Sequence, residues 1–192
     1  MTIIDGDVVS AGNINRQLPA TTSTVGRMKA EVMGERLKDI NPQLQLRVVP
    51  EFIRDKRMID ILEEAEYDYV VDAIDTLSPK VFLIYHSLRL KLKIVSSMGA
   101  GGKFDPTNIK IEDISKTNYC NLARMLRKKL HKLGVRDGFT AVYSPEVVDK
   151  DKIIRGSEET NKASSVGTIS YMPAAFGIMC ASVVIRDLTG TR

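Results

Sequence analysis

The sequence contains little cysteine and opens without a secretion signal. Of its 192 residues, only Cys120 and Cys180 are cysteines, which is too few for a disulfide framework. A tetrahedral zinc site needs about four ligands at short spacings, so we expect no zinc. The first residues lack the basic segment and apolar core of a signal peptide. We therefore expect a protein of the reducing cytoplasm.

Long apolar runs are also scarce. The longest, residues 169–185, is interrupted by Ser170, Pro173 and Ser182, and it is shorter than the roughly 18 to 20 apolar residues of a membrane span. A buried helix or a helix at a dimer interface is expected instead of a membrane span. With 43% hydrophobic residues, the chain can bury the core of one domain, expected to cover residues 1–192.

Strand and helix patterns alternate along the first half of the chain. Thr24 is predicted to cap a helix that ends before Pro42 and that carries Val32, Leu37 and Ile40 on its apolar face. The expected order is strand 2–4, that helix, strand 44–49, helix 58–64, strand 69–72, helix 77–90 and strand 94–97. This order predicts an α/β, Rossmann-like fold, in which a mostly parallel sheet has helices on both faces.

A basic helix is predicted to begin near Asn121. Its apolar stripe would consist of Leu122, Met125, Leu126, Leu130 and Leu133. The cations beside that stripe are Arg124, Arg127, Lys128, Lys129 and Lys132. Because the whole chain has a formal net charge of +4, this helix could follow nucleic-acid phosphates, but a solvated helix face is the ordinary explanation of a charge run.

Residues 144–165, which are polar and charged, are predicted to form a mobile loop.

Residues 3–17, with the sequence IIDGDVVSAGNINRQ, carry the clearest functional pattern. Asp5 follows a short apolar strand, and a carboxylate at the carboxyl edge of an α/β sheet can hold the ribose hydroxyls of a nucleotide. Asn13, Arg16 and Gln17 offer donors to polyphosphate oxygens, which carboxylates alone would repel. A polar loop in which these residues only satisfy turn geometry is the alternative.

Asp75 and Lys29 also suit a triphosphate. Asp72 and Asp75 both follow the strand at residues 69–72, so at least one of these two carboxylates should lie at the same sheet edge as Asp5. A carboxylate beside a triphosphate requires a divalent cation between them, and Mg²⁺ is the usual partner of hard oxygen ligands. We assign that role to Asp75 and expect Asp72 to cap a turn or helix. Lys29 can reach phosphates as a point charge, although it could also be an exposed helix lysine.

These residues occur in a recognisable order. Asn13-x-x-Arg16-Gln17 is followed by VGRMKAE, which contains Lys29, and then by VVDAIDT, which contains Asp75. The pattern resembles the ThiF/MoeB superfamily of ubiquitin-activating-enzyme-like adenylyltransferases. The resemblance implies binding of ATP and Mg²⁺, with Arg16, Lys29 and Asp75 as catalytic residues. Asp5, Asp7, Asn13 and Gln17 would complete the ATP site, with Asp75 as the Mg²⁺ ligand.

Further segments resemble the tRNA threonylcarbamoyladenosine dehydratase branch of that superfamily. They are INPQ at residues 40–43, the DAIDT and SPK run at residues 72–80, MGAGGKFDPTNIKIEDISKT at residues 98–117 and GTISYMPAAFG at residues 167–177. The resemblance implies ATP-dependent adenylation of a carboxylate, followed by cyclisation of the modified nucleoside with loss of water. It implies tRNA as partner, bound in part by the basic helix near Asn121, and a homodimer.

The resemblance leaves two alternatives. The chain could instead activate a ubiquitin-like sulfur-carrier protein, which would make a carrier or sulfur-transfer protein its partner. The second alternative is an inactive, N-terminally truncated fragment, because the family's first strand and glycine-rich turn do not precede the strand at residues 2–4. Superfamily members that pass substrates to a carrier use a catalytic cysteine. Cys120 has no histidine nearby in sequence, however, so a structural thiol is favoured.

Overall fold

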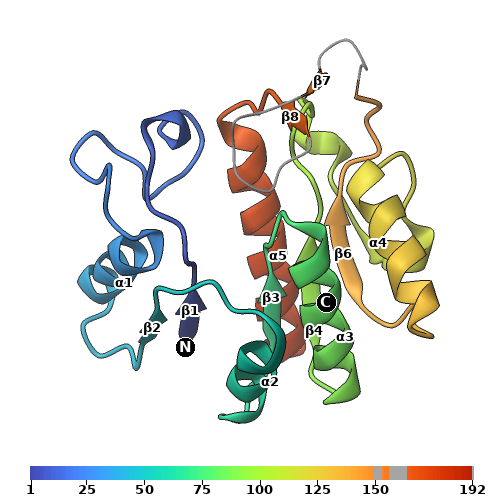
Figure 1. Ribbon diagram of the computed structural model, residues 1–192, viewed down its shortest axis with the longest axis horizontal. Coiled ribbons are helices and arrows are strands. Elements are labelled where there is room, and N and C mark those ends of the chain that lie inside the picture. The colour runs from blue at the N-terminus through green and yellow to red at the C-terminus, as the bar shows by residue number, and fades with distance from the viewer. Residues whose placement is uncertain (149–152, 156–163, 192) are drawn as a thin grey trace. The chain divides into compact units, whose positions relative to one another are not determined.

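The computed structural model describes residues 1–148, 153–155 and 164–191. The chain divides into two compact units, Met1–Arg57 (unit 1) and Met58–Arg192 (unit 2). Strands and helices alternate from residue 2 to residue 97 (Figure 1), and several of the later strands follow one another without an α-helix between them. α2 (Asp55–Glu63) begins in the last residues of unit 1 and continues into unit 2.

Unit 1 is built on two parallel strands and one long helix. β1 (Thr2–Ile4) pairs with β2 (Arg47–Val49), with Ile3 opposite Val48. The chain between them forms a 3-10 helix, η1 (Ala11–Asn13), and then α1 (Lys29–Ile40). This strand, helix and parallel strand confirm the predicted order, although the strand expected at residues 44–49 is limited to its last three residues.

α1 begins later than predicted, and Thr24 is not its cap. The Thr24 hydroxyl donates to the Pro19 carbonyl at 2.6 Å and closes a turn. Gly26 has a φ of 87°, in the left-handed region that a right-handed helix does not use. The backbone N–H of Val9 also donates to the Arg27 carbonyl at 2.8 Å. Backbone pairing with another segment thus occupies these residues and delays the helix.

Unit 2 contains a four-stranded sheet in the order β3-β4-β6-β5. β3 (Val70–Asp72), β4 (Ile94–Ser97) and β6 (Thr140–Tyr143) are parallel, and β5 (Lys110–Asp113) is antiparallel to β6. The mostly parallel sheet agrees with the sequence prediction. The carboxyl ends of β3, β4 and β6 therefore lie along one edge of this sheet.

Helices cover both faces of the unit 2 sheet (Figure 1). α3 (Leu77–Arg89) and α4 (Asn121–Lys132) pack on the face to which Ile94 points. α5 (Tyr171–Thr189) packs on the opposite face, against Val95. Adjacent strand residues point to opposite faces of a sheet, so Ile94 and Val95 belong to different cores. Two 3-10 helices, η2 (Pro106–Asn108) and η3 (Ile114–Lys116), flank β5.

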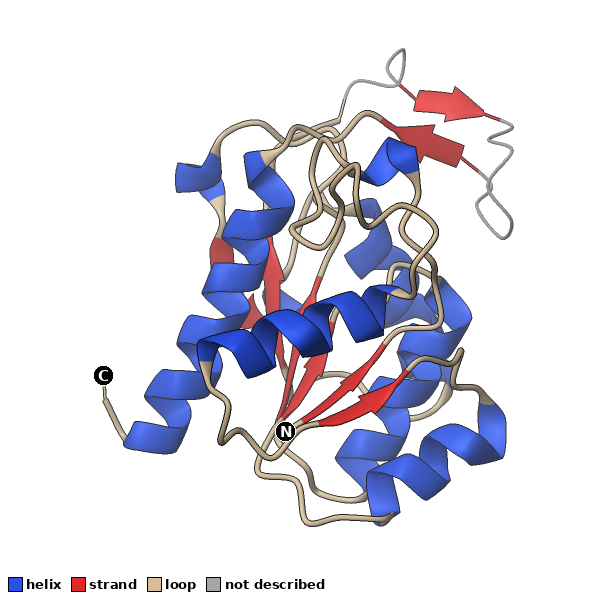
Figure 2. Cartoon of the chain, turned by 90° about the vertical axis from the view of Figure 1, so that its left-hand side faces the viewer, coloured by secondary structure: helices blue, strands red, loops and turns tan. Residues whose placement is uncertain are grey.

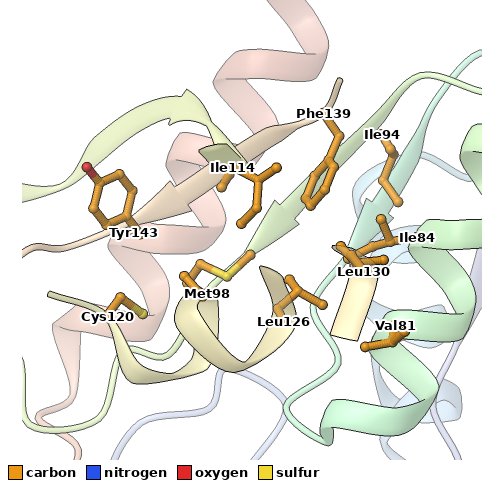
Figure 3. Packing of buried hydrophobic residues seen from close by; sticks show 12 residues of the cluster. Val81, Ile84, Ile94, Met98, Ile114, Cys120, Leu126, Leu130, Phe139 and Tyr143 are labelled. Atoms are coloured by element: carbon orange, nitrogen blue, oxygen red, sulfur yellow. The ribbon is translucent and has the colours of Figure 1, made fainter. Parts of the chain in front are cut away.

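The larger core lies between the sheet and the α3 and α4 helices. Figure 3 shows how its side chains interdigitate around Met98, Leu126 and Leu130. Cys120 and Tyr143 belong to the same cluster. Burial of an aliphatic or aromatic side chain contributes roughly 1.5 to 3 kcal/mol, so this cluster is a principal source of the stability of unit 2.

Three side chains predicted to be core residues are exposed instead. Ile40 is 69% exposed, Met125 is 49% exposed and Leu133 is 46% exposed. Ile40 is the last residue of α1 and Leu133 follows the end of α4, so neither has a further helical turn to hold it against the core. The buried residues of α4 are Ala123, Leu126 and Leu130; its apolar face is therefore narrower than the predicted stripe.

α5 is a core helix on one of its sides. Met172, Phe176, Cys180 and Val183 recur at helical spacing and are buried against the sheet. Within the residues that the structure describes, α5 is the one helix long and apolar enough to cross a membrane. A core helix with a row of buried side chains meets the same criterion, so this length is weak evidence for a membrane span.

Residues 144–165, predicted to form a loop, include strand structure. β7 (Ile153–Arg155) pairs with β8 (Ser164–Val166) in an antiparallel arrangement that is visible in Figure 2. The pairing places Ile154 opposite Ser165. Residues 149–152 and 156–163 of the predicted loop lie outside the described residues.

Candidate nucleotide-binding site

Asp5 lies just beyond the carboxyl end of β1, as predicted. Its backbone N–H donates to the Val49 carbonyl at 3.3 Å, and its carboxylate accepts from the Asp7 backbone N–H at 2.8 Å. At the next residue, Gly6, an added Cβ would lie 2.4 Å from the Phe52 backbone nitrogen. Only glycine allows the segments that follow β1 and β2 to approach so closely.

The Asn-x-x-Arg-Gln element forms one compact turn in unit 1. Asn13 is buried, and its side-chain oxygen accepts from the Ser10 backbone N–H at 3.1 Å. Its carbonyl accepts from the backbone N–H groups of Arg16 (3.0 Å) and Gln17 (2.9 Å). The Arg16 guanidinium donates to the Gly12 carbonyl at 2.7 Å. Since a guanidinium has five N–H donors, this bond orients Arg16 and leaves it able to bind an oxyanion.

Lys29 is the first residue of α1 and pairs with Asp7. The Lys29 ammonium lies 2.9 Å from the Asp7 carboxylate, and the Lys29 backbone N–H donates to the Asp7 carbonyl at 2.9 Å. The Lys29 side chain is 12% exposed, whereas that of Asp7 is 53% exposed. Lys29 is therefore held at the helix start by two interactions with Asp7. It is not a solvated helix lysine.

Asp72 is completely buried at the end of β3. Its carboxylate lies 2.7 Å from the Lys80 ammonium, which is also completely buried, and it accepts from the Ser96 hydroxyl at 2.5 Å. It also accepts from the Ile74 backbone N–H at 3.0 Å, which confirms the predicted turn-capping role. The ion pair with Lys80 was not predicted from the sequence.

Asp75 lies in the loop between β3 and α3, and its side chain is exposed. The described residues contain no cluster of three or more His, Cys, Asp or Glu side chains suited to a metal ion. Mg²⁺ bound with a nucleotide needs only one or two protein carboxylates, because phosphate and water oxygens complete its coordination. An exposed carboxylate at a sheet edge is compatible with that requirement, and the Mg²⁺ role of Asp75 stays a prediction.

The loops after β4 and β6 are tied together beside this edge. Lys103 is 3% exposed and donates to the Glu146 carbonyl, and burial lowers the pKa of its ammonium. The Glu146 carboxylate accepts from the backbone N–H groups of Phe104 (3.1 Å) and Asp105 (3.2 Å). The glycine-rich segment that starts at Met98 is thus a fixed turn.

The sequence matches a known family profile: residues 1–192 align with the ThiF family. The chain belongs to the ThiF family. This ThiF-family chain is 37% identical to tRNA threonylcarbamoyladenosine dehydratase of Haemophilus influenzae, over 98% of the chain and 76% of that protein. It is 34% identical to the Bacillus subtilis protein of the same name, over 97% of the chain and 76% of that protein.

Solved structures agree with these sequence comparisons. The Escherichia coli tRNA N6-threonylcarbamoyladenosine dehydratase, TcdA, in complex with ATP, matches this ThiF-family chain with a TM-score of 0.86 and 34% identity. The match covers 98% of this chain and 75% of TcdA. HcgE from Methanothermobacter marburgensis matches with a TM-score of 0.62 at 19% identity, which shows a shared fold alone.

The basic helix α4 of the ThiF-family chain is present as predicted, but its cations differ in their surroundings. Arg124, Lys128, Lys129 and Lys132 are exposed. Arg127 is half-buried and donates to the Thr117 carbonyl at 2.8 Å and to the Thr117 hydroxyl. Arg127 therefore fixes the end of η3, which leaves four exposed cations on the helix.

Sequence reasoning missed Lys80, although the pattern contained a signal for it. Lys80, Ile84 and Ser87 recur at helical spacing in α3, and all three are buried. That spacing places residue 80 on the core-facing side of the helix. Lysine is almost never fully buried unless it is paired, so burial there should have prompted a search for a carboxylate such as Asp72.

Proposed function

We propose that this chain is an ATP-dependent tRNA threonylcarbamoyladenosine dehydratase. The observation that carries the proposal is identity of 34% to 37% to dehydratases of that name over 97% to 98% of the chain. The ATP complex of TcdA, with a TM-score of 0.86, supports ATP as the second substrate. The polar turns that follow β1 and β3 provide the residue types that such a reaction requires.

We assign the nucleotide contacts to the residues that the sequence predicted. Asp5 binds the ribose hydroxyls, while Asn13, Arg16 and Gln17 face the phosphates with Lys29. Asp7 holds Lys29 at 2.9 Å before the nucleotide arrives, and Lys29 then shifts part of its interaction to a phosphate oxygen. Asp75 binds Mg²⁺, which supplies positive charge to the triphosphate.

The chemistry follows from this assignment. An oxygen of the threonyl carboxylate attacks the α-phosphorus of ATP, and the bond to the leaving pyrophosphate breaks. Arg16 and Lys29 disperse the charge that develops on the phosphoryl and leaving oxygens. The carbamoyl group of the same nucleoside then attacks the activated acyl carbon, AMP leaves and the ring closes. Ring closure needs no second encounter and no protein nucleophile.

The decisive experiment follows the nucleoside product. The purified chain is incubated with ATP, Mg²⁺ and tRNA that carries threonylcarbamoyladenosine, and the digested nucleosides are analysed by mass spectrometry. We expect a product lighter by one water, together with AMP and pyrophosphate. Arg16→Ala, Lys29→Ala and Asp75→Ala should each lower the rate by about 10²- to 10³-fold, because each removes preorganised charge stabilisation.

Arg36→Ala is the matched control for Lys29→Ala. Arg36 is an exposed cation on the same helix, α1, and the substitution should leave the rate within about twofold, since exposed substitutions away from a site have small effects. Absence of the cyclised nucleoside with wild-type chain would refute the dehydratase proposal. Adenylation of a sulfur-carrier protein in the same preparation would instead identify a carrier-activating enzyme.

The tRNA is assigned in part to α4. Arg124, Lys128, Lys129 and Lys132 are exposed on it, and the helix contains no acidic residue between Asn121 and Lys132. A row of cations attracts the negatively charged phosphate backbone of a nucleic acid. Arg127, also predicted to bind tRNA, supports this surface by fixing the adjacent η3 segment.

Oligomeric state and location complete the proposal. We assign a homodimer, with the side of α5 that contains Ile178 (68% exposed) and Ile185 (60% exposed) as its candidate contact. Exposed apolar side chains on a single helix face are typical of association surfaces. Light scattering coupled to gel filtration measures the mass directly, and a monomer at all concentrations would contradict the assignment. A cytoplasmic location agrees with a tRNA substrate.

A further inference from the structure

The buried ion pair of unit 2 joins two loops at the carboxyl edge of the sheet. Lys80 comes from α3 and Asp72 from the end of β3, and both side chains are inaccessible to solvent. In addition to this ion pair, the Lys80 ammonium donates to the Ile74 carbonyl at 3.0 Å and to the Ser97 carbonyl at 2.8 Å. The ammonium, which has three N–H donors, is therefore surrounded by three close oxygen atoms.

The two carbonyls lie at the start of two different loops. Ile74 belongs to the loop that contains Asp75, and Ser97 is the last residue of β4, immediately before the glycine-rich segment. One buried atom therefore fixes the points at which the chain leaves both β3 and β4. The Ser96 hydroxyl, 2.5 Å from the Asp72 carboxylate, holds the carboxylate from the β4 side.

The peptide groups beside Asp75 are held from two directions. The Ile74 N–H donates to Asp72 at 3.0 Å, and the Ile74 carbonyl accepts from Lys80 at 3.0 Å. The Ile74 carbonyl carbon is bonded to the Asp75 nitrogen, so the position of this carbonyl determines the position of the Asp75 backbone. The buried pair therefore fixes the residue next to the exposed carboxylate.

We propose that Asp72 and Lys80 are positioning residues that hold Asp75 in place for the Mg²⁺ of bound ATP; this inference rests on the proposed function. An apolar pair of similar volume would fill the same space, and replacement of a buried ion pair by apolar residues is often neutral for stability. It would not, however, provide a donor for the Ile74 carbonyl. The ammonium therefore supplies loop geometry in addition to packing.

The test separates nucleotide binding from its dependence on Mg²⁺. ATP affinity is measured by calorimetry with Mg²⁺ and with a chelator, for the wild type, Asp75→Ala, Lys80→Met and the double variant Asp72→Asn with Lys80→Met. We expect Mg²⁺ to tighten ATP binding by the wild type. In the three variants, the ratio of ATP affinity with Mg²⁺ to ATP affinity with chelator should be smaller than in the wild type by about tenfold or more. This is the usual effect of losing a residue that orients a metal ligand. Affinity without Mg²⁺ should change by less than about twofold, because the variants leave the unit 1 contacts intact.

The double variant distinguishes positioning from stability. Lys80→Met alone leaves a buried carboxylate without its cation, which is strongly destabilising, whereas the double variant removes both charges and should regain most of the lost stability. It still lacks a donor for the Ile74 carbonyl. If the double variant recovers both its melting temperature and its Mg²⁺ dependence, the ion pair has only a structural role and the inference is wrong.

A second readout needs no ligand. Hydrogen exchange at the backbone amides of Ile74 and Asp75 should be faster in the double variant than in the wild type, whereas Arg89→Met, at the far end of α3, should leave both rates unchanged. Unchanged exchange at these two amides in the double variant would overturn this inference but would leave the proposed function standing. Failure of the wild type to bind ATP with or without Mg²⁺ would refute the proposed function.

Discussion

At residue 80, the sequence pattern and the residue type point in opposite directions. The spacing of Lys80 with Ile84 and Ser87 indicates a buried position, whereas a lysine side chain favours solvent. Asp72 resolves the conflict, because its buried carboxylate lies 2.7 Å from the ammonium. The turn-capping role of Asp72 was predictable, since it depends on the residue two positions later in the chain. The ion pair was not, since it depends on how a helix packs against a strand.

Asp7 and Lys29 illustrate a similar limit. The sequence predicted that both contact ATP, and each residue type suits a nucleotide site. Their direct pairing at 2.9 Å depends on the antiparallel bridge between Val8 and Met28, which brings the two segments together. Sequence spacing could not reveal that bridge, because its two residues are far apart in the chain and neither belongs to a regular strand.

Asp113 provides a pH-dependent prediction. Burial alone would raise the pKa of this carboxyl, but hydrogen bonds from the hydroxyl and N–H of Ser115 and from the N–H of Gly138 lower it below the ordinary value of 3.8. A depressed pKa in the folded state contributes stability above the unfolded pKa, and this stability is lost as the pH falls through the folded value. The free energy of unfolding should therefore decrease on acidification.

Asp113→Asn removes the titrating group and should flatten the decrease below the ordinary pKa of 3.8. At neutral pH the variant should be less stable by about 1 kcal/mol, because the amide accepts these hydrogen bonds less strongly than the carboxylate does. Urea titrations of both proteins at a series of pH values measure the two slopes. Identical slopes would show that Asp113 does not contribute to acid sensitivity.

At the scale of elements, helix starts were predictable where the neighbouring chain is simple. α4 begins at Asn121 as predicted, because its apolar and basic pattern starts there without competing contacts. α1 begins at Lys29 instead of following Thr24, because the turn at Pro19 and the left-handed Gly26 interrupt the pattern. Strand positions were predicted well for β3 and β4, where buried apolar runs are bounded by polar residues.

Two glycine substitutions in helices should have opposite effects. At Gly34, an added Cβ lies 2.8 Å from a methyl carbon of Val48, which is a stiff β-branched side chain. Gly34→Ala should therefore lower the free energy of unfolding by about 1 to 2 kcal/mol, despite its better helix propensity. Gly177→Ala, in α5 with nothing within 4 Å of the added Cβ, should raise it by up to about 1 kcal/mol. Chemical denaturation measures both, and equal effects would contradict the packing of α1 against β2.

Charge reversal on α4 tests the tRNA assignment. The triple variant Lys128→Glu, Lys129→Glu and Lys132→Glu should weaken tRNA binding. It should also reduce the slope of log affinity against log salt by about one unit for each phosphate that the protein no longer neutralises. Filter binding at several salt concentrations measures the slope. Lys91→Glu, in the turn before β4, is the control and should retain the wild-type slope. An unchanged slope in the triple variant would remove α4 from the tRNA surface.

At the scale of the whole molecule, the parallel pairs of each unit followed from the alternation of strands and helices. β1 pairs with β2 and β3 pairs with β4, both in parallel as the predicted order implies. β4 also pairs in parallel with β6, a strand that was not predicted. The antiparallel β5 was not predicted, because residues 110–113 (KIED) combine apolar and charged side chains in a short run. The division into Met1–Arg57 and Met58–Arg192 also has no local sequence signal, since no linker composition marks it.

ATP should stabilise the folded chain by mass action. At a free ATP concentration about 100 times its dissociation constant, the expected gain is about 2.7 kcal/mol, measurable as a higher melting temperature. Hydrogen exchange on the same samples should show protection at residues 5–29 and at residues 72–76. Protection confined to one of these segments would contradict the assignment of nucleotide contacts to the other.

Both thiols of the chain are shielded, with Cys120 at 6% and Cys180 at 3% exposure. Burial also raises the pKa of Cys180 to about 11, which keeps its thiol protonated at neutral pH. The folded protein should thus be nearly inert towards maleimide reagents. A single cysteine introduced at an exposed position would accept a dye against a silent background. The fluorescence of that dye would then report directly on the arrival of substrate.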